Sequence, residues 1–168
     1  WPEQEETGFA VLRASEQALR NLAGVLDLDL KGVTIRVEIV RSNAELNTRA
    51  GVPADAPARD RLPPWTLGVS LHHSNHVVLM PVTGAKLHPL VTHELTHVAL
   101  DLKLAAGRAQ APRWVHEGLA QWMEGEMPAA QKDILGRAAA SNKLLARAQL
   151  EGAFEGAREQ TALAYAQS

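Results

Sequence analysis

The stretch that decides the fold is residues 89–107, which read PLVTHELTHVALDLKLAAG. Proline favours the first turn of a helix and glycine the position just after its end, so Pro89 and Gly107 bracket a predicted helix that runs to about Ala105. Its apolar residues recur at helical spacing, as expected of a helix with one buried face. They are Leu90, Val91, Leu95, Val98 and Leu102.

Within this helix, His93-Glu94-Leu95-Thr96-His97 has the spacing of a metal site. Histidines four positions apart share one helix face with Cβ atoms about 5–6 Å apart, so both imidazoles can reach one zinc ion at about 2.0–2.1 Å. Glu94 follows the first histidine directly and lies to the side of the ion, where it can take a proton from a metal-activated water. The motif predicts zinc ligation by His93 and His97, with Glu94 as general base.

A hydrolytic zinc site normally has three protein ligands and one position open to water. A third histidine on the same segment would need Gly at position 100 and His at position 103, but Leu100 and Lys103 stand there. Residues 112–120 read PRWVHEGLA and open a second predicted helix, which supplies Glu117 after a short loop. Glu117 is therefore the predicted third ligand.

His116 competes with Glu117 for this role. Adjacent helical residues point about 100° apart, so only one of the two can face the ion, and we favour Glu117. Gly118 has no side chain, which would let this helix approach the metal helix closely. The chemistry predicted is metal-assisted hydrolysis, in which Glu94 accepts a proton from the attacking water and returns it to the leaving group.

Composition places the chain among ordinary globular proteins. Its 168 residues, 46% hydrophobic and 21% charged, suit one domain with a sizeable core. The absence of cysteine excludes a thiolate zinc site, a thiol nucleophile and disulfides. A net charge of −2 with dispersed Lys and Arg argues against a nucleic-acid partner, and no apolar run approaches the roughly 18–20 residues of a transmembrane segment. Because the chain begins at Trp1, we expect a processed or excised form that could have lost a signal peptide or anchor.

The segments before the metal helix predict one helix and then a small sheet. Apolar residues at helical spacing indicate an amphipathic helix from about Glu5 to Leu28. Alternating β-branched residues indicate a strand over 33–40, and two short apolar runs indicate strands over 65–71 and 76–80. Four prolines within 51–64 indicate a surface loop.

The segments after the metal helix predict helices only. They run from Pro112 to near Gly125, from Pro128 to about Gln149, and from about Ala157 to the end, where the pattern stops without a cap and we expect a truncated helix. The order of helix, strands and helices is that of an α+β domain. We predict a single domain over 1–168, divided into an N-terminal helix at 1–30, a sheet region at 33–81 and a helical region at 89–168.

The two motifs together, over 93–97 and 112–120, resemble the gluzincin zinc metallopeptidases, and most closely the small bacterial peptidase MA-like domains, relatives of thermolysin and aminopeptidase N. The likeness continues through 150–154 and 164–168, so it covers about residues 33–168. It implies a zincin-like catalytic domain that holds one Zn²⁺ per chain and hydrolyses peptide bonds. It also implies a small mixed sheet whose edge strand aligns the substrate above the metal helix.

The resemblance further implies roles for residues around the metal. Tyr165, the only tyrosine in the chain, matches a residue that stabilises the tetrahedral intermediate in the aminopeptidase relatives, the alternative being an ordinary core or surface tyrosine. Gln121 stands one turn after Glu117, where the family more often has an acid that accepts a hydrogen bond from a ligand histidine. Asp101, one turn after His97, is either a second group of this kind or a solvent-exposed acid.

For the substrate, we expect strand addition along 76–80 as the edge strand. His72, His73 and His76 are expected to be surface or cleft residues and not a second metal site. No acidic motif that would capture a free amino terminus precedes the metal helix, which favours an endopeptidase over an aminopeptidase.

Two alternatives to an active peptidase stay open. One is a catalytically silent or autoinhibited zinc-binding interaction domain, and the other is a helical scaffold in which the motif is accidental. Family habit predicts an extracytoplasmic or membrane-tethered location, with the cytoplasm as the alternative.

Overall fold

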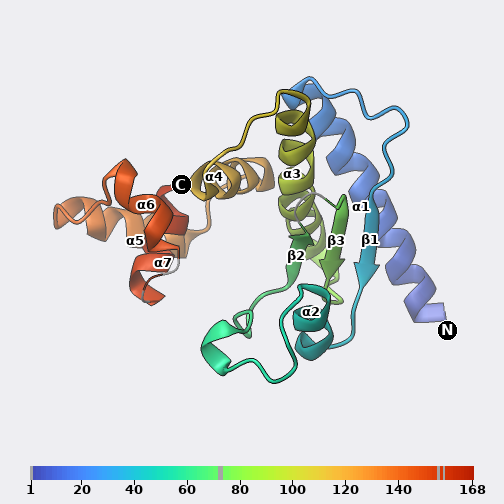
Figure 1. Ribbon diagram of the computed structural model, residues 1–168, viewed down its shortest axis with the longest axis horizontal. Coiled ribbons are helices and arrows are strands. Elements are labelled where there is room, and N and C mark those ends of the chain that lie inside the picture. Colours follow the sequence, from blue (N-terminus) through green and yellow to red (C-terminus); the bar gives the residue numbers. More distant parts are fainter. Residues whose placement is uncertain (1, 72–73, 155, 157) are drawn as a thin grey trace.

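The computed structural model describes residues 2–71, 74–154, 156 and 158–168, and within them the fold is α+β, as predicted (Figure 1). The helices are α1 (Pro2–Leu26), α2 (Asn43–Arg49), α3 (Leu87–Ala106), α4 (Arg113–Glu124), α5 (Ala129–Ala140), α6 (Arg147–Ala153) and α7 (Arg158–Gln167). The strands are β1 (Arg36–Ile39), β2 (Gly68–Leu71) and β3 (His76–Leu79), and short 3-10 turns occupy Ala58–Asp60 and Gly84–Lys86.

The sheet is mixed, and its strand order corrects one prediction. The order is β1-β3-β2, with β1 parallel and β2 antiparallel to β3. The segment 76–80 is therefore central, and the prediction that it forms the edge strand is wrong. Val77, Val78 and Leu79 are each at most 1% exposed, because a central strand is covered on both faces and so carries an unbroken apolar run. The edge strand beside α3 is β2.

The main core lies between the sheet and the two longest helices. Val77 and Leu79 project from β3 toward α1 and α3, which cover this face (Figure 1). The helices contribute Val11, Ala14, Ala18 and Leu22 from α1, and Val91, Leu95, Val98 and Ala99 from α3. Burial of the apolar stripe of α3 fixes the rotation of this helix about its axis, and with it the direction in which the two histidines point. Deleting a fully buried leucine side chain such as Leu95 would cost about 2–5 kcal/mol.

The opposite face of the sheet carries a smaller core. Val78 packs there with Val40 and with Leu46 of α2. The Ser42 hydroxyl accepts a hydrogen bond from the amide of Glu45 at 3.2 Å and so caps α2.

The C-terminal helices form a separate group packed on α4, away from the sheet (Figure 1). The helix predicted from Pro128 to Gln149 is in fact two, α5 and α6. Asn142 adopts a positive φ of 53° and the amide of Lys143 donates to the Ala138 carbonyl at 2.8 Å, which closes α5. Leu150, Ala153, Phe154 and Ala164 make up the core of this group, and Trp114 of α4 packs against it.

Among the described ranges, no helix is both long and apolar enough to cross a membrane.

Candidate metal centre

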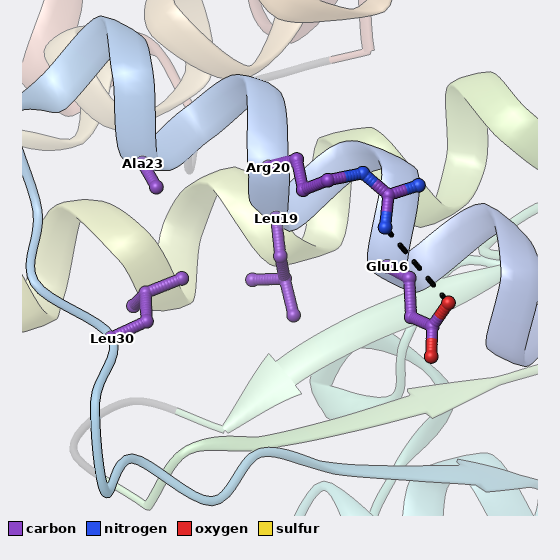
Figure 2. Close-up of a pocket in the computed structure, with 5 residues that line it drawn as sticks. All are labelled: Glu16, Leu19, Arg20, Ala23 and Leu30. Atoms are coloured by element: carbon purple, nitrogen blue, oxygen red, sulfur yellow. Dashed lines mark ion pairs between the residues drawn. The ribbon is translucent and has the colours of Figure 1, made fainter.

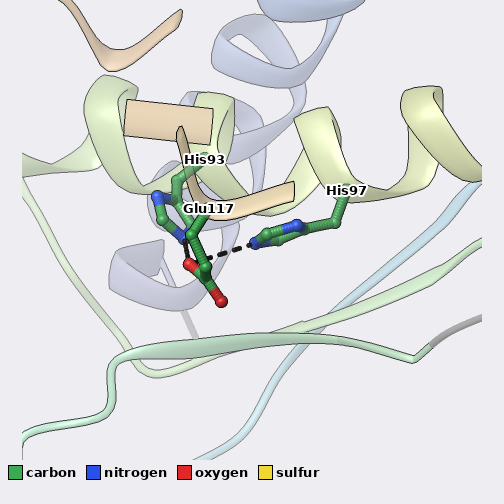
Figure 3. A group of neighbouring side chains, drawn as sticks. All are labelled: His93, His97 and Glu117. Atoms are coloured by element: carbon green, nitrogen blue, oxygen red, sulfur yellow. Dashed lines mark ion pairs between the residues drawn. The ribbon is translucent and has the colours of Figure 1, made fainter. Parts of the chain in front are cut away.

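Helix α3 places two histidines side by side. The rings of His93 and His97 have centroids 4.9 Å apart and are inclined at 78°. Helix α4 brings Glu117 to the same point, and one ligand atom from each of the three residues lies within 4.8 Å of those of the other two (Figure 3). Side chains 93 and 97 come from one helix and the third from another, as the sequence predicts.

The Glu117 carboxylate faces both imidazoles through one oxygen. Its Oε2 lies 3.5 Å from His93 Nε2 and 3.9 Å from His97 Nε2. Ligand atoms at about 2.0–2.2 Å from a tetrahedral ion are roughly 3.3–3.6 Å apart, so these spacings approach those of a bound ion. Two imidazole nitrogens and one carboxylate oxygen are also a donor set that catalytic zinc takes. His93, His97 and Glu117 therefore fit a zinc ion in both spacing and donor type.

His116, the alternative to Glu117 as third ligand, faces Asp101 and not the cluster. Its Nε2 lies 3.8 Å from Asp101 Oδ1, and its ring stacks on that of His97 with centroids 5.8 Å apart. Asp101 is thus largely buried, with its side chain 14% exposed, and its partner is His116. Of the two alternatives for Asp101, a solvent-exposed acid is wrong.

The acid that hydrogen-bonds a candidate ligand histidine is Glu124, which the sequence analysis did not identify. His93 Nδ1 hydrogen-bonds Glu124 Oε1. Gln121, predicted for this role, instead donates through Nε2 to the Tyr165 carbonyl at 2.7 Å and ties α4 to α7. Glu124 lies two turns after Glu117 and so on the same face of α4, and this spacing was the signal available in the sequence.

The missing side chain of Gly118 makes room for the end of α7 and not for α3. A Cβ at position 118 would overlap the backbone oxygen of Ser168, at the end of α7. The prediction that this glycine admits the metal helix is wrong, and its bare backbone admits the C-terminal segment instead.

Charge interactions link the side chains of this centre. Burial lowers the pKa of His93, but hydrogen bonds to Glu117 and Glu124 and the charge of Glu94 outweigh it and raise the pKa to about 10. Burial raises the pKa of Glu117, but its hydrogen bond to His93 and the nearby charges of His97 and Arg113 bring it below its ordinary value. The neighbouring carboxylates therefore favour the protonated form of His93.

Glu94 lies against the sheet edge and is 6% exposed. Burial raises its pKa to about 7; the charges of Glu117 and Glu124 act in the same direction, and His93 and the Ser70 amide oppose them. A Cβ at Gly68 would lie only 2.9 Å from both Cγ and Oε1 of Glu94. The glycine at the start of β2 therefore makes room for the predicted base.

Tyr165 lies at the periphery of the centre. Its hydroxyl accepts a hydrogen bond from Arg113 Nη2 at 3.3 Å, and its ring packs edge-on against Phe154. Burial raises the pKa of Tyr165; the charge of Glu117 adds to this, whereas Arg113 opposes it.

The other predicted histidines lie outside this centre or outside the described residues. His72 and His73 fall in the part of the chain that the structure does not describe. His76 Nε2 lies 3.3 Å from Glu38 Oε2, which also pairs with Arg36, while Glu38 Oε1 bonds Arg49. Because His76 alternates with Val77, this ion-pair group is on the face of the sheet opposite α3.

A shallow hollow of about 400 Å³ lies beside α1 (Figure 2). It is lined by Glu16, Leu19, Arg20, Ala23 and Leu30, and Glu16 and Arg20, one turn apart on α1, form an ion pair at 4.0 Å. None of its lining residues belongs to the metal cluster.

A comparison with protein families matches residues 61–168 to the family described as the peptidase MA superfamily. The matched range holds β2, β3 and every helix from α3 onward, including the whole metal cluster. No curated protein and no solved structure matches the chain.

Proposed function

The chain belongs to the peptidase MA superfamily, and on that premise we propose that it is a zinc metallopeptidase whose catalytic domain spans residues 1–168. The observation that carries the proposal is the convergence of His93, His97 and Glu117 beside a buried Glu94. Ligands and base then lie on two helices that the main core holds in place.

The three ligands and the base divide the chemistry between them. A zinc ion held by His93, His97 and Glu117 would leave one position for water, lower the pKa of that water and polarise a peptide carbonyl. The buried Glu94 accepts the proton of the attacking water as general base. It then returns the proton to the leaving amine. Tyr165 is proposed to donate a hydrogen bond to the developing oxyanion.

We propose that the substrate adds to β2 and not to β3. The amide of Met80 donates to the Leu67 carbonyl at 2.7 Å, so alternate residues of the antiparallel pair, Gly68 and Ser70, direct their backbone groups to the open edge. Ser70 does so beside Glu94, whose carboxylate accepts from its amide. An extended peptide pairing with this edge would pass in front of the base.

An endopeptidase is favoured over an aminopeptidase. Binding a free amino terminus requires a carboxylate that is not otherwise engaged. Among the described residues of the centre, Glu117 and Glu124 pair with His93 and Glu94 is the proposed base. An internal stretch of polypeptide, with no terminal charge to neutralise, fits this site better.

The test compares the wild type with Glu94→Gln, in which the ligands are intact. Both proteins are loaded with zinc, freed of excess metal and assayed for zinc per chain and for cleavage of a mixed library of internally quenched peptides. We expect one zinc per chain in both, cleavage by the wild type alone and loss of that cleavage with a chelator. A zinc-loaded wild type that cleaves nothing in the library would favour the silent interaction domain, and a chain without zinc would favour the accidental motif.

A further inference from the structure

Arg113 joins the metal centre to the C-terminal helices. It is the first residue of α4, one turn before Glu117. It contacts four other side chains. Its backbone amide donates to Glu151 Oε1 at 3.0 Å, and its guanidinium lies 5.0 Å from the Phe154 ring centroid. Its Nη2 donates to the Tyr165 hydroxyl at 3.3 Å, and its Nε lies 3.6 Å from Glu117 Oε1. One side chain thus contacts a proposed ligand and the proposed oxyanion donor together.

The two oxygens of Glu117 have different partners. Oε1 faces Arg113, whereas Oε2 faces His93 and His97. A carboxylate can bind a metal ion through one oxygen or through both. A guanidinium on Oε1 keeps that oxygen turned away from the histidines and leaves Oε2 as the donor.

The residue type suits this double contact. The guanidinium is a planar fork with several N–H donors, so different nitrogens can contact different partners at once. The Phe154 ring supports its plane, and the Glu151 carboxylate fixes the backbone from which it starts. A lysine would keep the charge but offer a single ammonium.

We propose that Arg113 is a positioning residue of the metal centre, which restricts Glu117 to one-oxygen ligation and holds the Tyr165 hydroxyl beside the same carboxylate. This inference rests on the proposed role of Glu117 as ligand. It makes the group of α6 and α7 part of the site, because the contacts that orient Arg113 come from those helices.

The experiment compares the wild type with Arg113→Met and Arg113→Lys, and uses Arg147→Met as the matched control because Arg147 also opens a helix and is exposed. Zinc affinity is measured by competition with a chelating dye. Ionisation of Tyr165 is measured by phenolate absorbance in the metal-free protein, where the single tyrosine makes the signal specific. Circular dichroism shows which variants fold.

We expect Arg113→Met to weaken zinc binding about tenfold and to raise the pKa of Tyr165, because the neighbouring positive charge that opposes its rise is gone. Arg113→Lys is expected to restore part of the zinc affinity and part of the decrease in the Tyr165 pKa. If Arg113→Met does not fold, the lysine variant alone is compared with the wild type. Wild-type zinc affinity or an unchanged tyrosine titration in the folded variants overturns the proposal. A wild type without zinc overturns the proposed function instead, and the titration still reports the contact between Arg113 and Tyr165.

Discussion

His93 and Glu124 are hydrogen-bonded from one helix to the next, through Nδ1 of the imidazole and Oε1 of the carboxylate. This bond commits Nδ1 and leaves Nε2 as the nitrogen that faces Glu117. A carboxylate on the outer nitrogen of a ligand histidine fixes the orientation of the ring and makes it a better donor to a metal. The pair therefore orients His93, the first of the proposed ligands.

Glu124→Ala is expected to weaken zinc binding by about 10- to 100-fold, because His93 loses the partner that orients it. Equilibrium competition with a chelator measures this effect. Glu126→Ala is the matched control, since Glu126 is exposed and pairs with Lys132 away from the histidines. Equal zinc affinities in the two variants would show that Glu124 does not support the site.

Zinc affinity is expected to rise with pH. In the metal-free protein the carboxylates around His93 raise its pKa to about 10, so near neutrality a proton must leave before the nitrogen can bind an ion. While His93 is protonated, the apparent affinity should increase roughly tenfold per pH unit. Calorimetry in buffers of different ionisation enthalpy should show release of about one proton per zinc. A zinc affinity that does not change with pH, together with no proton release, would contradict a protonated His93 in the metal-free protein.

The three residues of the candidate metal cluster could be predicted because their geometry is largely local. The relation between His93, Glu94 and His97 is set by helix periodicity alone, and Glu117 follows from the loop and the next helix. Glu124 lies 31 positions from His93 along the chain. Its spacing from Glu117 indicates which face of α4 it occupies, but whether it reaches His93 depends on how α3 and α4 pack.

The strand order and the contacts of the C-terminal helices could not be predicted because they too depend on how separate elements pack. The alternation and the apolar run over 76–80 identify a strand, but its place in the sheet depends on which neighbours pair with it. No sequence pattern singles out Arg113, and its contacts form only when α6 and α7 fold back onto α4. The break after α5 had a local signal in Ser141 and Asn142, which the helical pattern on either side obscured.

Glu94→Gln is expected to stabilise the metal-free protein at alkaline pH. Burial raises the pKa of Glu94 to about 7 from an ordinary value of 4.5, so folding favours its protonated form. Its contribution to stability is complete below about pH 4.5 and is lost as the pH rises through about 7. Relative to the wild type, the variant should therefore gain up to about 3 kcal/mol near pH 8 and little near pH 4.5. Urea unfolding with a chelator present measures the difference, and a gain that is the same at both pH values would contradict it.

Gly68→Ala is expected to reduce peptide cleavage by at least about tenfold while zinc per chain stays at the wild-type level. A Cβ at this position would lie 2.9 Å from Glu94 Oε1 and from Leu79 Cδ2, so the base must move away from the attacking water. A displacement of about 1 Å in a catalytic group can cost on the order of a hundredfold in rate. Gly24→Ala is the control, because a Cβ there meets no atom within 4 Å and alanine favours the helix. Zinc content and peptide cleavage are measured on the same preparations. Full activity in Gly68→Ala would show that the position of Glu94 does not depend on the space left by Gly68. Loss of zinc would show that the substitution disturbs the metal ligands and not the base.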